Sequence, residues 1–173
     1  MSVRGRPLLE RTVALATSII DDVYVSVRAD QIDDPLRKQF RLIVDSRNNL
    51  GPAAGILAAH AEHPDVAWLV LACDLPLLDS KSIRLLVRSR KTHRAATAYR
   101  SPEDGLPEPL CAIYEPDTLE RFRHHADSGD SLSPRSLLVN GDVELLEPLG
   151  GRVLSNVNTP DDLTRLGMKD AAE

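Results

Sequence analysis

Leu69-Val-Leu-Ala-Cys-Asp-Leu-Pro76 is the stretch that decides the fold. Its apolar run begins at Ala67 and stops at one acid, Asp74, and Pro76 blocks any extension. The run is too uniformly apolar for a half-exposed strand, so it predicts a central parallel strand covered on both faces. Ligands of open α/β sheets bind beyond the carboxyl ends of such strands, where a carboxylate suits a Mg²⁺ that also holds a phosphate. The alternative is structural, because a lone Asp after a strand also starts turns or caps a helix.

Strand and helix patterns alternate along the rest of the chain. The predicted strands cover residues 23–27, 41–45, 67–73, 95–99, 109–114 and 143–146, and a further extended segment covers 153–157. The predicted helices cover residues 7–20, 53–60, 79–90, 117–125 and 160–166, and a short one starts at Ser133-Pro134. This alternation predicts an α/β, Rossmann-like three-layer sandwich with a mostly parallel sheet and right-handed crossovers.

Size and composition restrict the class of protein. A chain of 173 residues fits a single domain, residues 1–173. The net charge of −5, without a basic stripe, argues against nucleic acid and anionic membranes as partners. Cys73 and Cys111 fall in apolar runs, and we interpret both as reduced core residues. No apolar stretch reaches ~18 residues and the N-terminus is no signal peptide, so a cytoplasmic protein is expected.

A glycine-rich turn precedes the second predicted helix. In Gly51-Pro-Ala-Ala-Gly55, Gly51 and Pro52 form a tight turn at the helix N-terminus, whose N–H groups suit an anion or a nucleotide edge. Gly55, one turn later, permits close approach of another group. The alternative is a plain loop-to-helix turn in which Gly55 packs under a strand.

Two polar sites lie further along the chain. Asn156 and Asn158 alternate with Val157, so on one strand face their amides could hold a ligand or a metal-bound water. Turn chemistry is the alternative for Asn158. Glu108 enters an apolar strand between two prolines, and the alternative there is a solvated edge charge. The histidines show no metal spacing and neither cysteine has a placed base, so nucleophilic catalysis is not expected.

Taken in order, these motifs resemble the molybdenum cofactor guanylyltransferase family of nucleotidyltransferases along nearly the whole chain. The matching segments are residues 5–8, 25–31, 51–57, 72–76, 107–114, 133–135 and 156–163. Members of that family transfer GMP from GTP to molybdopterin cofactor, use Mg²⁺ and release pyrophosphate. The resemblance therefore implies GTP and molybdopterin cofactor as substrates and Mg²⁺ as cofactor.

The resemblance also implies roles for single residues. Asp74 corresponds to the metal ligand, and Asp74 and Asn158 to the catalytic residues. Ser26 stands where many relatives carry a guanine-contacting Asn, so a transferase using CTP or a sugar phosphate stays open. The implied nucleotide-binding residues are Ser26, Asp45, Gly51, Pro52, Gly55 and Asp74, and the implied acceptor-binding residues are Glu108, Asn156 and Asn158.

Relatives begin with a strand and a Gly-Gly, Arg, Asp-Lys loop that binds the triphosphate, and this sequence starts just after that loop. The resemblance therefore implies a domain lacking the usual first strand and phosphate loop, with little or no transferase activity of its own. Residues 23–27 and 67–73 would then pair directly or present open edges, which invite self-association or proteins of molybdenum cofactor biosynthesis. A non-catalytic remnant that binds molybdopterin cofactor or such a partner is the remaining alternative.

Overall fold

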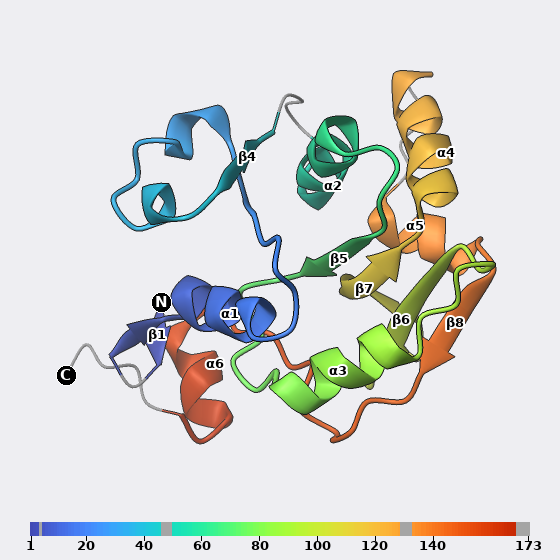
Figure 1. Cartoon of the computed structure of the whole chain (residues 1–173). Coiled ribbons are helices and arrows are strands. Elements are labelled where there is room, and N and C mark those ends of the chain that lie inside the picture. The colour runs from blue at the N-terminus through green and yellow to red at the C-terminus, as the bar shows by residue number, and fades with distance from the viewer. Residues whose placement is uncertain (4, 46–49, 129–132, 169–173) are drawn as a thin grey trace.

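A mixed four-stranded sheet forms the centre of the molecule (Figure 1). Its strands lie in the order β5 (Trp68–Leu71), β7 (Pro107–Tyr114), β6 (Ala96–Arg100) and β8 (Val143–Leu146). β7 runs antiparallel to both of its neighbours, and β6 and β8 are parallel. The computed structural model describes residues 1–3, 5–45, 50–128 and 133–168.

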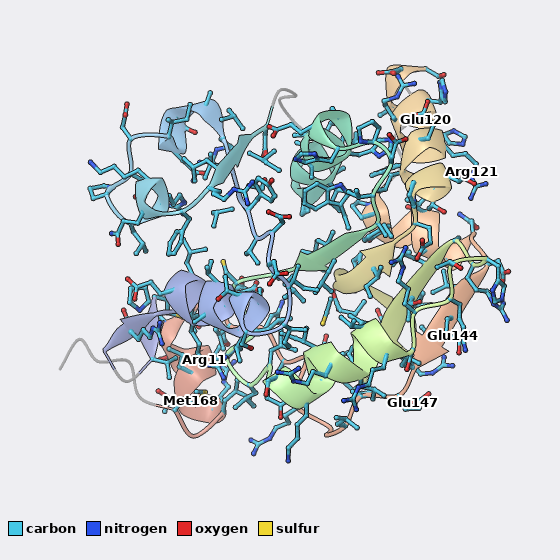
Figure 2. The ribbon with its side chains drawn as sticks, viewed as in Figure 1. Arg11, Glu120, Arg121, Glu144, Glu147 and Met168 are labelled. Carbon is cyan, nitrogen blue, oxygen red and sulfur yellow. The ribbon has the colours of Figure 1, made fainter. Side chains whose placement is uncertain are left out.

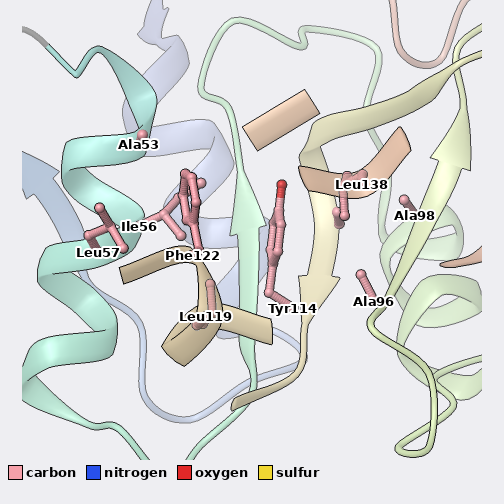
Figure 3. Packing of buried hydrophobic residues seen from close by; sticks show 10 residues of the cluster. Ala53, Ile56, Leu57, Ala96, Ala98, Tyr114, Leu119, Phe122 and Leu138 are labelled. Atoms are coloured by element: carbon pink, nitrogen blue, oxygen red, sulfur yellow. The ribbon is translucent and has the colours of Figure 1, made fainter. Parts of the chain in front are cut away.

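Helices cover both faces of this sheet. Side chains of β7 alternate between two clusters, with Ala112 and Tyr114 on one face and Cys111 and Ile113 on the other. The first cluster includes residues of α2 (Pro52–Glu62), α4 (Pro116–Asp127) and α5 (Pro134–Val139), and Figure 3 shows part of it. The second includes residues of α1 (Leu8–Thr17) and α3 (Ser80–Arg88). The three-layer α/β arrangement is therefore confirmed.

Smaller elements lie beside the sheet. β3 (Val25–Val27) and β4 (Leu42–Val44) form a parallel pair, and the chain between them makes short 3-10 turns at Ala29–Gln31 and Arg37–Gln39. β1 (Ser2–Val3) and β2 (Arg6–Pro7) form an antiparallel hairpin. A third cluster joins Val3 and Leu8 to Leu163 of α6 (Pro160–Arg165).

Four of the sequence predictions are wrong. The strand before Asp74 is not a central parallel one: β5 is half-exposed, antiparallel to β7, and at the edge of the sheet. The sheet is accordingly mixed rather than mostly parallel. Residues 153–157 form turns and coil instead of an extended segment. Cys73 is exposed, because it lies beyond the end of β5, whereas Cys111 is buried as predicted.

Capping contacts confirm the predicted starts of two helices. The Asp79 carboxylate accepts a hydrogen bond from the Ser82 N–H at 2.8 Å and caps α3. Thr159 and Asp162 form a capping box at α6. In the described part of the chain, no helix combines the length and the apolar character needed to cross a bilayer.

Candidate functional site

Three of the predicted nucleotide-binding residues meet where β3, β4 and α2 come together. The Ser26 hydroxyl of β3 donates a hydrogen bond of 2.6 Å to Asp45 Oδ1, just beyond β4. The parallel register sets this contact, since the Asp45 N–H donates to the Val27 carbonyl at 2.8 Å. Gly55 faces the pair so closely that a Cβ there would lie 2.2 Å from Ser26 Oγ and 3.3 Å from Asp45 Oδ1. Only glycine therefore fits beside Ser26 and Asp45.

The start of α2 has the predicted turn. Gly51 precedes the helix with a φ of +54°, a left-handed conformation that glycine adopts without strain, and Pro52 occupies the first helical position. Gly51 is the N-cap residue and has no side chain that could cap the helix. An anion at this helix end would interact favourably with the partial positive charge of the helix dipole.

A second group of residues surrounds Asp74. The Val157 N–H donates a hydrogen bond of 2.9 Å to the main-chain carbonyl of Asp74, which ties the loop before α6 to the end of β5. Val157 is buried, while Asn156 and Asn158 on either side of it are exposed. Exposed and buried side chains therefore alternate here as they would in a strand, although these residues form coil. Both amides face solvent next to the residue that is hydrogen-bonded to Asp74.

Glu108 completes this second group from the start of β7. β7 is antiparallel to β5, and the Ala72 N–H donates to the Leu110 carbonyl at 2.8 Å, which brings Glu108 opposite the end of β5. Its side chain is 20% exposed, so the alternative of a freely solvated charge is wrong. Arg135 NH2 lies 3.5 Å from Glu108 Oε2, and Arg135 also pairs with Asp104.

Chain topology places the two groups at one edge of the fold. A short loop joins α2 to β5, and α2 packs against β3, β4 and β5. Helix and strand therefore run in opposite directions, and the start of α2 lies at the end of β5 that leads to Asp74. Within the described residues, no hydrogen bond or ion pair joins Ser26, Asp45 or Gly55 directly to Asp74.

The electrostatics of the second group favour a bound cation. Burial raises the pKa of the Asp74 carboxyl, and burial likewise raises the pKa of Glu108. Asp74 forms no ion pair with any described residue, and a hydrogen bond from its own backbone offsets the desolvation only in part. No three His, Cys, Asp or Glu side chains gather as a metal site in the part of the chain that the structure describes. A metal at Asp74 would therefore need oxygens from a ligand, which is how proteins usually hold Mg²⁺ with phosphates.

Arg135 is a site residue that the sequence predictions did not assign. It lies in the first turn of α5, where the helix dipole disfavours a cation. The sequence could have pointed to Arg135 through this position, because a basic residue at a helix start is stabilised by an acidic partner or an anionic ligand. Glu108 and Asp104 supply the partners.

Comparisons with known proteins show the family of this chain. Residues 1–154 match the family model of the MobA-like NTP transferase domain. The molybdenum cofactor guanylyltransferase of Pseudomonas aeruginosa (strain LESB58) is 32% identical over 162 residues, which is 91% of this chain and 79% of that protein. The molybdenum cofactor biosynthesis bifunctional protein of Synechocystis is 29% identical, over 94% of this chain but 46% of that longer protein.

A solved structure shares the fold. The molybdopterin-guanine dinucleotide biosynthesis protein A of Archaeoglobus fulgidus superposes with a TM-score of 0.74 at 22% identity, over 95% of this chain and 86% of that one. The family match covers most of the chain, and the curated relative above 30% identity is covered over most of its length. This chain belongs to the MobA-like NTP transferase domain family.

Proposed function

We propose that the site on this chain is that of a transferase that moves GMP from GTP to molybdopterin cofactor and releases pyrophosphate, with Mg²⁺ held at Asp74. The observation that carries the proposal is the half-buried carboxylate of Asp74, which has no ion-pair partner among the described residues and lies at the sheet edge where α2 starts beside Ser26 and Asp45. The names of the relatives supply the substrate class.

The chemistry needs no protein nucleophile. An oxygen of the cofactor's phosphate attacks the α-phosphorus of GTP, a new phosphorus–oxygen bond forms, and the bond to the bridging oxygen breaks as pyrophosphate leaves. A bound Mg²⁺ neutralises charge that develops on the phosphates. Asp74 would hold and orient that ion. The amides of Asn156 and Asn158 and the carboxylate of Glu108 orient the acceptor, and Arg135 offers the cation that an acceptor phosphate requires.

The pair of Ser26 and Asp45 favours guanine over cytosine. The Ser26 proton is used on Asp45, so the pair presents oxygens that accept hydrogen bonds. The N1–H and amino groups of guanine are adjacent donors, whereas cytosine offers one amino donor beside an acceptor nitrogen. We therefore expect GTP to be preferred although Ser26 is not an Asn.

The test combines turnover with binding. The purified chain is incubated with molybdopterin cofactor, Mg²⁺ and either GTP or CTP, and the dinucleotide product is measured by mass spectrometry. Asp74→Asn is expected to lower the rate on the order of 10²- to 10³-fold, as removal of one charge-stabilising group does. Asp79→Asn is the matched control, because this acid caps α3 and Asn also caps helices well.

Measurements of ligand binding test the same proposal if turnover is too slow to measure. Titration with GMP, CMP and Mn²⁺ is expected to show GMP bound more tightly than CMP, and Mn²⁺ with GMP lost in Asp74→Asn. Equal activity and equal Mn²⁺ binding in wild type and Asp74→Asn would remove Asp74 from the proposal.

A further inference from the structure

His60 is a buried polar side chain on α2, and the other buried residues of that helix are apolar. It is 2% exposed, and its Nε2 lies 3.2 Å from Glu120 Oε2 on α4. An ionised carboxylate only accepts hydrogen bonds, so Nε2 carries the proton. Nδ1 is buried and has no hydrogen-bond partner among the described residues. Burying an imidazole with an unpartnered nitrogen is less favourable than burying an aliphatic side chain. The presence of His60 at this position is therefore better explained by a function than by stability.

The rest of α2 gives little to fix its position. Apart from Ile56 and Leu57, the helix packs with alanines and Gly55, and Figure 3 shows Ile56 beside Phe122 of α4. Small side chains leave shallow ridges, which specify the rotation and shift of a helix weakly. Among the described residues, the His60–Glu120 hydrogen bond is the one polar side-chain contact between α2 and another helix.

Glu120 is itself held firmly on α4, where Figure 2 labels it. Arg123 donates to it from Nε at 3.0 Å and from NH2 at 2.7 Å, and His124 Nε2 lies 3.1 Å from its Oε1. These contacts come from the same helix. Glu120 is therefore a fixed acceptor toward which His60 draws α2.

His60 and Gly55 lie on nearly opposite sides of α2. Five residues at 3.6 per turn place them about 140° apart around the helix axis. One side thus meets Glu120, and the other meets Ser26 and Asp45. Since α2 moves as a rigid element, a shift away from α4 brings Gly55 toward Ser26 and Asp45, and packed elements tolerate little such movement.

We infer that His60 is a positioning residue for the nucleotide site, and that its bond to Glu120 sets how closely α2 approaches Ser26 and Asp45. Its effect on nucleotide affinity rests on the proposed function, whereas its effect on the position of α2 does not. The geometry of the ligand-free protein is therefore measured separately from affinity.

The experiment compares three variants. His60→Leu fills the space and removes the hydrogen bond, and His60→Gln keeps an N–H that can reach Glu120. His124→Leu is the matched control, because it removes another imidazole from Glu120 without touching α2. Amide resonances of Ser26 and Gly55 are recorded in the ligand-free protein by NMR, and the dissociation constant for GMP is measured by calorimetry.

His60→Leu is expected to shift both amide resonances and to weaken GMP binding on the order of 3- to 30-fold. His60→Gln is expected to restore most of both, and His124→Leu to leave both at the wild-type values. A His60→Leu protein that melts earlier but keeps both resonances would show a purely structural role and overturn the inference. If the wild type itself binds no GMP, the proposed function fails, while the resonances still decide the positioning role.

Discussion

Gly55 is the residue whose size the candidate site tolerates least. A methyl group there would meet the Ser26 hydroxyl at 2.2 Å, so Gly55→Ala must displace Ser26 or lift α2. We expect a loss of stability of about 1–3 kcal/mol, as for other overpacked positions, together with weaker GMP binding. Urea unfolding and calorimetry measure the two effects.

The same substitution should change sign when Ser26 is removed. In a Ser26→Gly background only the 3.3 Å approach to Asp45 Oδ1 remains, which a small shift of that side chain relieves, and Gly55→Ala is expected to stabilise the helix by up to about 1 kcal/mol. Gly151→Ala serves as the control, because no atom lies within 4 Å of its added Cβ. Equal destabilisation by Gly55→Ala in both backgrounds would contradict the assigned contact.

At the scale of the element, α4 predicts a dependence of stability on pH. Hydrogen bonds from Arg123, and then from His60, lower the pKa of Glu120 from 4.5 to about 2. A carboxyl with a lowered folded-state pKa stabilises the fold above its unfolded pKa, and this contribution disappears as the pH falls through the folded value. Glu120→Gln should therefore be less stable than wild type near pH 5, and the difference should vanish toward pH 2.

Urea unfolding between pH 2 and 5 checks this expectation. Glu62→Gln on α2 is the control, because it removes an equal charge from an exposed side chain that forms no ion pair with the described residues. A constant difference between Glu120→Gln and wild type across that range would mean that the Arg123 and His60 contacts do not hold the carboxylate ionised.

Elements were easier to predict than their pairing. The strand before Asp74 was found because its apolar run and the following acid are local signals. Its direction relative to β7 depends on the chain after Pro107, which no feature of residues 67–73 records. Glu108, Asp45 and Ser26 were assigned through the family resemblance, and the structure adds the contacts they make. Arg135 was missed because its partner Asp104 lies in a loop 31 residues away.

At the scale of the whole molecule, the strands of residues 23–27 and 67–73 were predicted either to pair directly or to present open edges. In the structure they belong to two separate sheets. β3 pairs only with β4 and β5 only with β7 among the described residues, so the two strands do not pair with each other. The three-layer order followed from alternating patterns, but the break between the sheets did not, because it depends on hydrogen bonds between distant segments. Each of β3 and β5 thus has one open edge, as the second alternative stated.

This division predicts two levels of local stability. A two-stranded pair has little support of its own, whereas β6 and β7 lie inside the larger sheet. The rings of Tyr24 and Trp68, 5.8 Å apart and edge to face, join β3 to β5. Native-state hydrogen exchange should show β3 and β4 opening at a lower free energy than β6 and β7. Tyr24→Leu should lower the opening free energy of β3 and β4 by about 0.5–1.5 kcal/mol, and leave that of β6 and β7 unchanged.

Equal opening free energies for all four strands in both proteins would show instead that the two sheets unfold as one cooperative unit.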